Sequence, residues 1–175
     1  ERRPALTISF TPPQPSSLDL DANDSSGQTG ADFAAAFVED GGPVAIADVD
    51  AVLTDVDSST MDSLTVTITN LLDGAAESLA ADTSGTSITA SYDSPTGVLT
   101  LSGTDSLANY QLVLRTVTYD NASQSPNETA RSITFVANDG YRDSNTATTT
   151  VSVTGQNDPP TISPSTFALP ENSAN

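Results

Sequence analysis

The run Leu64-Thr65-Val66-Thr67-Ile68-Thr69 has an apolar side chain at every second position and a threonine between each pair. Successive side chains of a β-strand point to opposite faces. The pattern therefore predicts a strand with Leu64, Val66 and Ile68 turned inward and the threonines turned outward. Regular alternation of this kind favours a folded β protein over a disordered chain, even though Ser, Thr, Asp, Asn and Gly dominate the composition.

The same alternation returns at short intervals along the chain. Asp93-Ser94-Pro95-Thr96-Gly97 supplies turn residues between two such runs and predicts a hairpin. Asp105 and the apolar residues that follow it predict a short helical turn with Asp105 as its N-cap. Seven to nine short strands separated by turns are typical of an all-β sandwich. The predicted strands cover residues 33–37, 44–46, 64–69, 88–92, 98–101, 113–119, 133–137 and 147–153, with one more leading to Asp55 and Asp57.

The charge balance is strongly acidic. The 175 residues include 23 acidic side chains, five arginines, no lysine and no histidine, for a formal charge of −18. Nucleic-acid partners need a basic face, and anionic membrane surfaces attract basic segments, so both are excluded as partners. Divalent cations are the ligands that such a chain favours. No apolar run approaches the ~18 residues of a membrane span.

Several catalytic chemistries are also excluded by composition. Without cysteine or histidine, the chain has no zinc site, no thiol nucleophile and no histidine-based triad. Paired carboxylates can hydrolyse glycosides. Such sites usually have aromatic platforms for sugars, however, and this chain has five phenylalanines, four tyrosines and no tryptophan. We therefore expect no enzyme activity.

Both ends of the chain carry the same signature, a strand followed by prolines. Leu6–Phe10 alternates and runs into Pro12-Pro13, and Thr149–Thr154 leads to Pro159-Pro160. We therefore expect one complete module within a longer tandem array. Residues 1–15 are predicted to be the last strand and linker of a preceding module, 16–156 the complete module, and 157–175 the linker and first strand of the next.

Five short motifs follow one another in a fixed order along the chain. The motifs are Val38-Glu39-Asp40, Leu53–Asp57, Val136–Gly140, Asn157–Pro160 and Leu169–Asn172. In this order they resemble the cadherin repeats, and more closely the cadherin-like repeats of large bacterial surface proteins. The resemblance implies a Greek-key sandwich of the Ig/cadherin type, with Ca²⁺ bound between repeats. Gly155 and Pro159 depart from the linker pattern, so one or two ions per junction are expected.

Strands that run alternately up and down assign the acidic residues to two ends of the module. Asp55, Asp57 and Asp139 are predicted to meet at the upstream junction. Calcium takes six to eight oxygen ligands, and both ends offer suitable oxygens. The alternative is that these are polar turn residues, which need no metal. The downstream junction is predicted to contain Glu39, Asp120, Asn157 and Asp158, and Glu171 is predicted to act in the next repeat as Glu39 does here.

Four aspartates lie within residues 48–57. If the intervening chain is extended, Asp50 and Asp55 lie about 17 Å apart, too far for one cation to hold both pairs. Asp48 and Asp50 are therefore predicted to lie in a solvated turn. The segment from Asp19 to Gly27 superficially resembles the start of an EF-hand but lacks the required Gly and Glu positions. A solvated loop is predicted there, with Asp19 or Asp21 as further candidates for the upstream site.

The expected function is a calcium-stabilised structural and adhesive repeat of a large extracellular or cell-surface protein. Its partners would be neighbouring repeats of the same protein and a surface protein or glycan. Two alternatives stay open. One is a carbohydrate-binding or spacer module of a secreted polysaccharide-active enzyme, and the other is a building block of an extracellular filament.

Overall fold

A computed structural model of the chain describes residues 12–160, in which eleven strands and one α-helix are joined by turns. The predicted strand at Leu6–Phe10 and the predicted ligand Glu171 lie outside the described residues. The helix α1 spans Leu107–Leu114, and a short 3₁₀ helix η1 spans Gly74–Ala76. The strands are β1 (Ser17–Asp19), β2 (Phe33–Val38), β3 (Val44–Ala45), β4 (Val52–Thr54), β5 (Thr60–Ile68), β6 (Glu77–Ala80), β7 (Thr89–Asp93), β8 (Val98–Ser106), β9 (Thr118–Asn121), β10 (Arg131–Asn138) and β11 (Ala147–Thr154).

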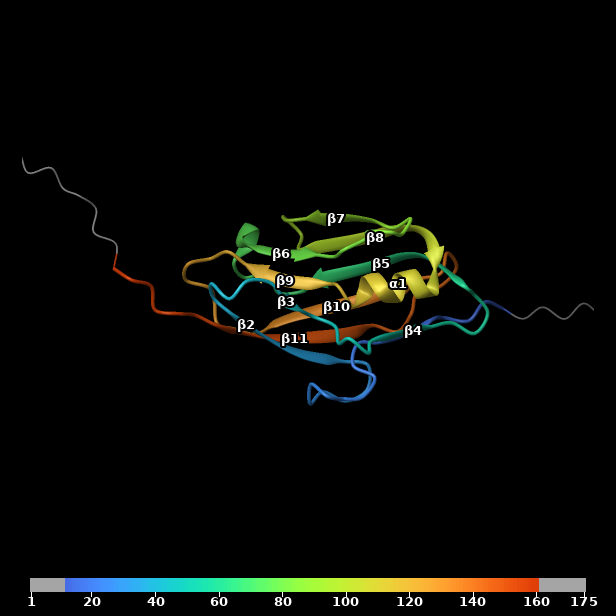
Figure 1. Cartoon of the computed structure of the whole chain (residues 1–175), viewed down its shortest axis with the longest axis horizontal. Coiled ribbons are helices and arrows are strands. Elements are labelled where there is room, and N and C mark those ends of the chain that lie inside the picture. Colours follow the sequence, from blue (N-terminus) through green and yellow to red (C-terminus); the bar gives the residue numbers. More distant parts are fainter. Residues whose placement is uncertain (1–11, 161–175) are drawn as a thin grey trace, which may run out of the picture.

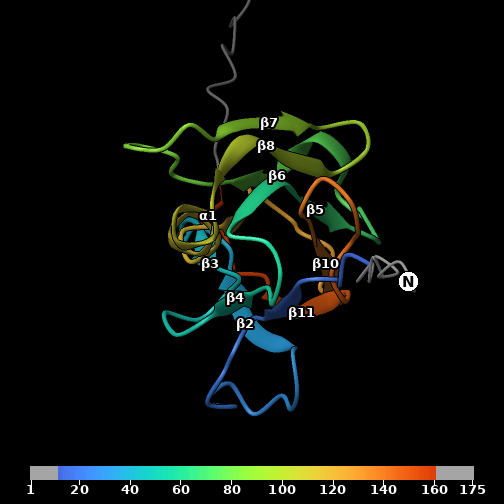
Figure 2. The same cartoon turned by 90° about the vertical axis from the view of Figure 1, so that its right-hand side faces the viewer.

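The strands form two layers, which confirms the prediction of an all-β sandwich, but the described residues contain eleven strands and not the seven to nine predicted. One layer is a six-stranded sheet in the order β2-β11-β10-β5-β8-β7. The other holds the three-stranded sheet β3-β9-β6 and the pair β1-β4. Figure 2 shows the molecule end-on, with α1 and β3 on the side opposite β5 and β10. All strand pairs are antiparallel except β2 with β11, which run parallel.

The core lies between the layers and begins with the stretch that predicted the fold. Leu64, Val66 and Ile68 of β5 are at most 2% exposed, whereas the threonines between them are half-buried. Phe37 of β2 and Tyr119 of β9 join the two layers through an edge-to-face contact, with ring centroids 5.5 Å apart. Fully burying one such side chain contributes about 1.5–3 kcal/mol, so the apolar interior holds the sheets together without disulfides.

The helix differs from the prediction in length and in its cap. Eight residues are helical, and Ser106 is the N-cap, because its hydroxyl accepts a hydrogen bond from the Asn109 backbone N–H at 3.2 Å. Tyr110, Val113 and Leu114 all turn into the core from α1. The predicted strand over 113–119 is therefore wrong at its start: apolar residues spaced by three and four positions pack as a helical face, and β9 begins only at Thr118.

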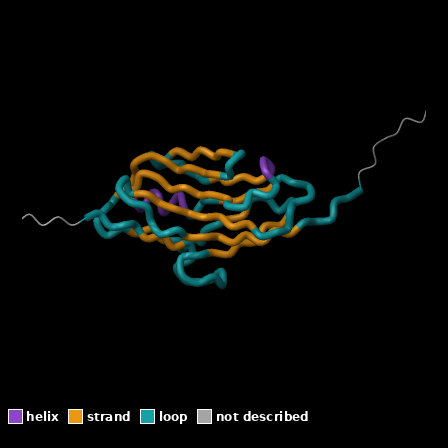
Figure 3. Tube along the Cα trace, turned by 180° about the vertical axis from the view of Figure 1, so that it is seen from behind, coloured by secondary structure: helices purple, strands orange, loops and turns teal. Residues whose placement is uncertain are grey.

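The two described ends of the chain lie at opposite ends of the long axis, as Figure 1 shows. The segment from Asp21 to Gly30, which we call the 21–30 loop, projects from the body beside β2 (Figures 1 and 3). No helix among the described residues is long and apolar enough to cross a membrane.

Candidate metal centres

Asp55, Asp57 and Asp139 form the upstream cluster, at the end of the sandwich where the described chain begins. Each offers a carboxylate oxygen, and these oxygens all lie within 4.8 Å of one another. Asp55 follows the end of β4 and Asp139 follows the end of β10, so two strands deliver the carboxylates to one place. The grouping derived from strand direction is thus present in the fold, and the role of these residues as metal ligands stays a prediction.

Turns at the strand ends fix two of these carboxylates. One oxygen of Asp55, Oδ1, accepts hydrogen bonds from the backbone N–H groups of Asp57 and Ser58 at 2.9 and 2.8 Å. Oδ1 of Asp139 accepts from the N–H groups of Tyr141 and Arg142 at 2.8 and 2.7 Å. In both residues the turn uses Oδ1, and no described donor binds the second oxygen.

The second oxygen of Asp55, Oδ2, is buried and has no hydrogen-bond partner. A buried acceptor left without a donor costs about 1–3 kcal/mol. Burial raises the pKa of Asp55, but the hydrogen bonds from Asp57 and Ser58 outweigh it, so the pKa lies below the ordinary aspartate value and the group stays ionised.

No described cation neutralises this charge. Within residues 12–160 the ion pairs are those of Arg131 with Asp73 and Glu77, away from the upstream cluster. Carboxylate oxygens held by turns and lacking donors are the ligands that hard divalent cations prefer. The three carboxylates therefore have the ligand chemistry of a hard divalent cation site.

The incoming chain reaches the upstream cluster directly. The backbone N–H of Gln14 donates to Oδ2 of Asp57 at 3.0 Å. Ser17 pairs with Thr54, so continuing the β1–β4 ladder by one residue sets Ser16 opposite Asp55. Ser16 is 3% exposed, and its hydroxyl is also buried without a partner. The residues that precede β1 and the acidic cluster are therefore in contact at this end.

At the opposite end, Glu39 borders an open hollow of about 620 Å³. Glu39 is 1% exposed; its Oε2 accepts the Gln156 N–H at 2.7 Å, while its Oε1 is buried without a partner. Asn157 also lines the hollow, as predicted for a downstream site. The full lining is Glu39, Gln124, Ser125, Pro126, Asn127, Glu128, Gly155, Gln156 and Asn157.

Glu128 is a carboxylate of this hollow that the sequence analysis missed. Its Oε1 accepts the Gly155 N–H at 3.1 Å. A Cβ on Gly155 would lie 3.2 Å from this oxygen and 3.5 Å from Oε2 of Glu39. The missing side chain at Gly155, which departs from the expected linker pattern, thus leaves room for the close approach of Glu128, whereas 3.5 Å from Glu39 would be an ordinary contact.

Other predicted downstream ligands lie elsewhere. Asp120 sits within β9 opposite Ser78, and its Oδ1 accepts the N–H of Asn121, so it does not line the hollow. Asp158 is exposed and borders a separate, smaller depression with Gln124 and the two prolines that follow. Strand counting predicted one shared site for these residues, but neither Asp120 nor Asp158 lines the hollow that Glu39 borders.

A buried ion pair positions the segment that carries Glu128. Arg131 is fully buried and binds Glu77 and Asp73, and it also donates to the backbone carbonyls of Asn127 and Thr129. Tyr119 completes the network by donating to Oε1 of Glu77 at 2.8 Å. Both carboxylates are therefore paired, and the loop before β10 is tied to the core.

The predictions for Asp21, Asp48 and Asp50 need correction. Asp21 is fully buried rather than part of a solvated loop, and Asp48 and Asp50 are half-buried. Oxygens from these three residues lie within 4.8 Å of one another, so Asp21 joins Asp48 and Asp50 and not the upstream cluster. The segment from Ala22 to Ser25 is exposed as predicted.

No family model, no curated protein and no solved structure matches the chain. Its function therefore has to be inferred from the fold and from the geometry of these acidic sites.

Proposed function

We propose that this chain is a calcium-stabilised structural and adhesive repeat of a large extracellular protein, with a sandwich of the cadherin-like Greek-key type. One observation carries the proposal: the upstream cluster joins three carboxylates, no described cation and a buried Asp55 oxygen without a donor. A bound calcium ion would supply the missing partner and offset the mutual repulsion of the carboxylates.

The positions of the acidic sites support a role between modules. Gln14 contacts Asp57 where the described chain enters, and Gln156 contacts Glu39 where it leaves. A cation at either end would have ligands from the module body and lie next to the linker. Adjacent modules would then be held in a fixed orientation, which gives a stiff array with neighbouring repeats as its first partners.

A carbohydrate-binding module receives less support. Sugar platforms usually present an aromatic pair on one face, whereas Tyr141 is the exposed aromatic side chain among the described residues. A filament subunit and an adhesive repeat share the same end-to-end geometry, so a lateral contact seen in solution would favour the filament.

Thermal unfolding of the 175-residue chain with and without EDTA tests the calcium claim. Extracellular modules bind calcium with dissociation constants near 10⁻⁴–10⁻³ M. With free calcium about five times that constant, each site adds roughly 1 kcal/mol of stability. Two sites would raise the midpoint by about 4–8 °C, at about 2–4 °C per kcal/mol for a domain of this size. An unchanged midpoint in EDTA would refute the proposal.

A further inference from the structure

The turn that follows β10 presents two side chains at the upstream end of the module. Tyr141 is 78% exposed, and Arg142 is the one arginine of residues 12–160 that is exposed to solvent. Arg142 forms no ion pair with another described residue. Tyrosine and arginine are enriched among the residues that dominate binding energy at protein interfaces. In a chain with five arginines and no lysine, this exposed pair is a candidate contact surface.

Hydrogen bonds within the turn hold it in one conformation. Oδ1 of Asp139 accepts the N–H groups of both Tyr141 and Arg142, and the N–H of Asp139 donates to the Arg142 carbonyl at 3.3 Å. The amide of Asn138 donates to Oδ1 of Asp143 at 2.7 Å across the base of the turn. Because the backbone is already ordered, docking of the two side chains would cost little backbone entropy.

The downstream hollow has a lining complementary to a basic side chain. Glu39 and Glu128 both border this space of about 620 Å³, and most of the other lining side chains carry amide oxygens. Glu39 is buried, and its Oε1 has no partner among the described residues. A guanidinium group has five N–H donors and no acceptor, so it suits carboxylate and amide oxygens. Within residues 12–160 no cation pairs with either glutamate.

The smaller depression beside the hollow suits the tyrosine. Its volume is about 440 Å³; it shares Gln124 with the hollow and is otherwise lined by Asp158 and the two prolines that follow. Proline rings offer an apolar surface on which an aromatic ring can pack. Tyr141 and Arg142 are consecutive residues, so a single turn can reach two depressions that adjoin.

We propose that the Tyr141–Arg142 turn of one copy docks in the downstream hollow of a second copy, with the guanidinium of Arg142 bound by Glu39 and Glu128. The turn lies beside the upstream cluster and the hollow lies beside the chain exit, so the contact joins copies head to tail along the long axis (Figure 1). A contact between two different surfaces does not close as a dimer and continues into an open series.

This contact adds a direct interaction between modules to the proposed calcium-stabilised array, and it rests on that function only for its tandem setting. A short linker would hold neighbouring modules at millimolar effective concentration, so a weak contact is enough to orient them. The contact needs no metal. Its failure and the failure of the calcium proposal are therefore separate results.

Self-association of the 175-residue chain in EDTA tests the contact without calcium. Sedimentation equilibrium up to about 1 mM protein covers the concentration range that tethering would create. Arg142→Gln and Glu128→Gln should each lower the association constant at least about tenfold, because each removes one partner of a close charge pair. Neither change is expected to unfold the module: Arg142 is exposed, and glutamine keeps an acceptor oxygen for the Gly155 N–H.

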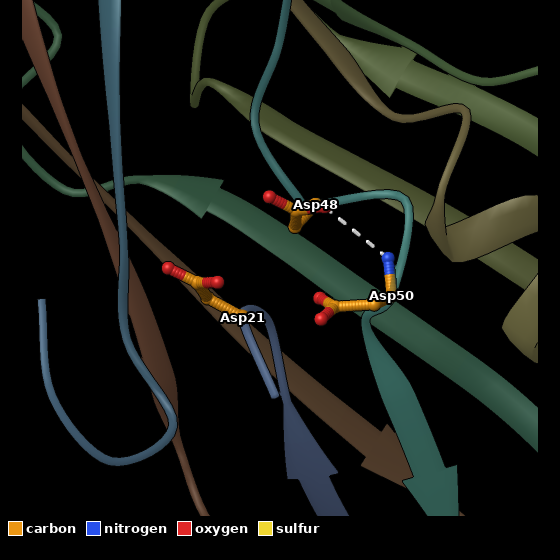
Figure 4. Close-up of side chains that lie close together, drawn as sticks. All are labelled: Asp21, Asp48 and Asp50. Carbon is orange, nitrogen blue, oxygen red and sulfur yellow. Dashed lines mark hydrogen bonds between the residues drawn. The ribbon is translucent and has the colours of Figure 1, made fainter. Parts of the chain in front are cut away.

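Two variants are matched controls for Glu128→Gln and should associate as the wild type does. Asp24→Asn removes one negative charge from an exposed position, and Asn tolerates its positive φ of 54°. Asp50→Asn removes one from the acidic cluster of Asp21, Asp48 and Asp50, which belongs to neither surface (Figure 4). An effect of either control as large as that of Glu128→Gln would mean that net charge, and not the hollow, governs association.

A charge exchange makes the test specific. Arg142→Glu and Glu128→Arg should each fail to associate alone, whereas their equimolar mixture should associate, because each supplies the surface that the other has lost. The double change Arg2→Gln with Arg3→Gln removes positive charge elsewhere and should leave association unchanged. A wild type that stays monomeric to about 1 mM would overturn the proposal, as would equal association of Arg142→Gln or a mixture that stays monomeric.

Discussion

Asp139→Asn should change the stability of this protein in a way that depends on calcium. Oδ1 of Asp139 accepts two backbone N–H groups, and an asparagine carbonyl oxygen can accept the same pair. The new amide NH₂ would then take the place of the second carboxylate oxygen of Asp139. The substitution removes one negative charge from a cluster in which Oδ2 of Asp55 is buried without a partner.

The expected stabilisation follows from the distances between the carboxylate oxygens of the upstream cluster. Two unit charges 4.8 Å apart repel by about 3.5 kcal/mol at an effective dielectric constant of about 20. Asp57 is exposed and Asp55 is half-buried, so solvent reduces this repulsion. We expect a net stabilisation of about 1–3 kcal/mol in EDTA, or a rise of about 2–12 °C in the melting midpoint.

Calcium should remove this advantage. The wild-type site gains about 1 kcal/mol at five times the dissociation constant and about 2.7 kcal/mol at a hundred times. Asp139→Asn loses a charged ligand and should gain less. Differential scanning calorimetry across a calcium series measures how the melting midpoints of the wild type and of Asp139→Asn depend on calcium. Asp24→Asn is the charge-matched control. A variant less stable than wild type in EDTA, or a difference that does not vary with calcium, would refute the reasoning.

Three further predictions concern other parts of the fold. Arg131→Met should destabilise the protein by about 3–5 kcal/mol in urea unfolding, because Glu77 keeps a buried charge without its partner; adding Glu77→Gln should recover part of the loss, and no recovery would contradict the ion-pair explanation. Gly155→Ala should weaken calcium binding several-fold in a titration, since the new methyl group would lie 3.2 Å from a carboxylate oxygen of the downstream hollow; unchanged binding would place the ion elsewhere. The N–H of Ser87 holds the pKa of Asp105 below its ordinary value, so its ionised form favours the folded state. This stability is present above about pH 4 and is lost as the pH falls through the lowered pKa, which urea unfolding between pH 5 and 3 would measure.

Local pattern was enough to predict most of the sandwich. Leu64, Val66 and Ile68 alternate with threonines because one face of their strand packs on the core. The alternation in the sequence therefore predicts the buried face directly. The pattern failed at Val113 and Leu114, where apolar residues satisfy a helical period as well as a strand. Serine and aspartate are both favoured at helix N-caps, so the sequence alone does not decide between Ser106 and Asp105.

The acidic sites show where sequence reasoning ends. Strand direction was enough to place Asp55 and Asp139 at one end. Successive strands run in opposite directions, so only the number of strands between the two residues mattered. Asp21 instead lies beside Asp48 and Asp50, far away in the chain, and a polar loop sequence carries no sign of these neighbours. Glu128 was missed for a similar reason: its hydrogen bond with the Gly155 N–H joins two segments that are distant in sequence.

The parallel pairing of β2 and β11 has a mechanical consequence. The described chain enters at one end of the long axis and leaves at the other, so tension applied through it runs along the strands (Figure 1). β11 leads directly to the exit, and its ladder with β2 is continued by the hydrogen bond from the Glu39 N–H to the Thr154 carbonyl at 2.9 Å. A pull then loads these bonds together in shear instead of opening them one at a time. The parallel strand pair at this edge of the six-stranded sheet is thus also suited to bearing load.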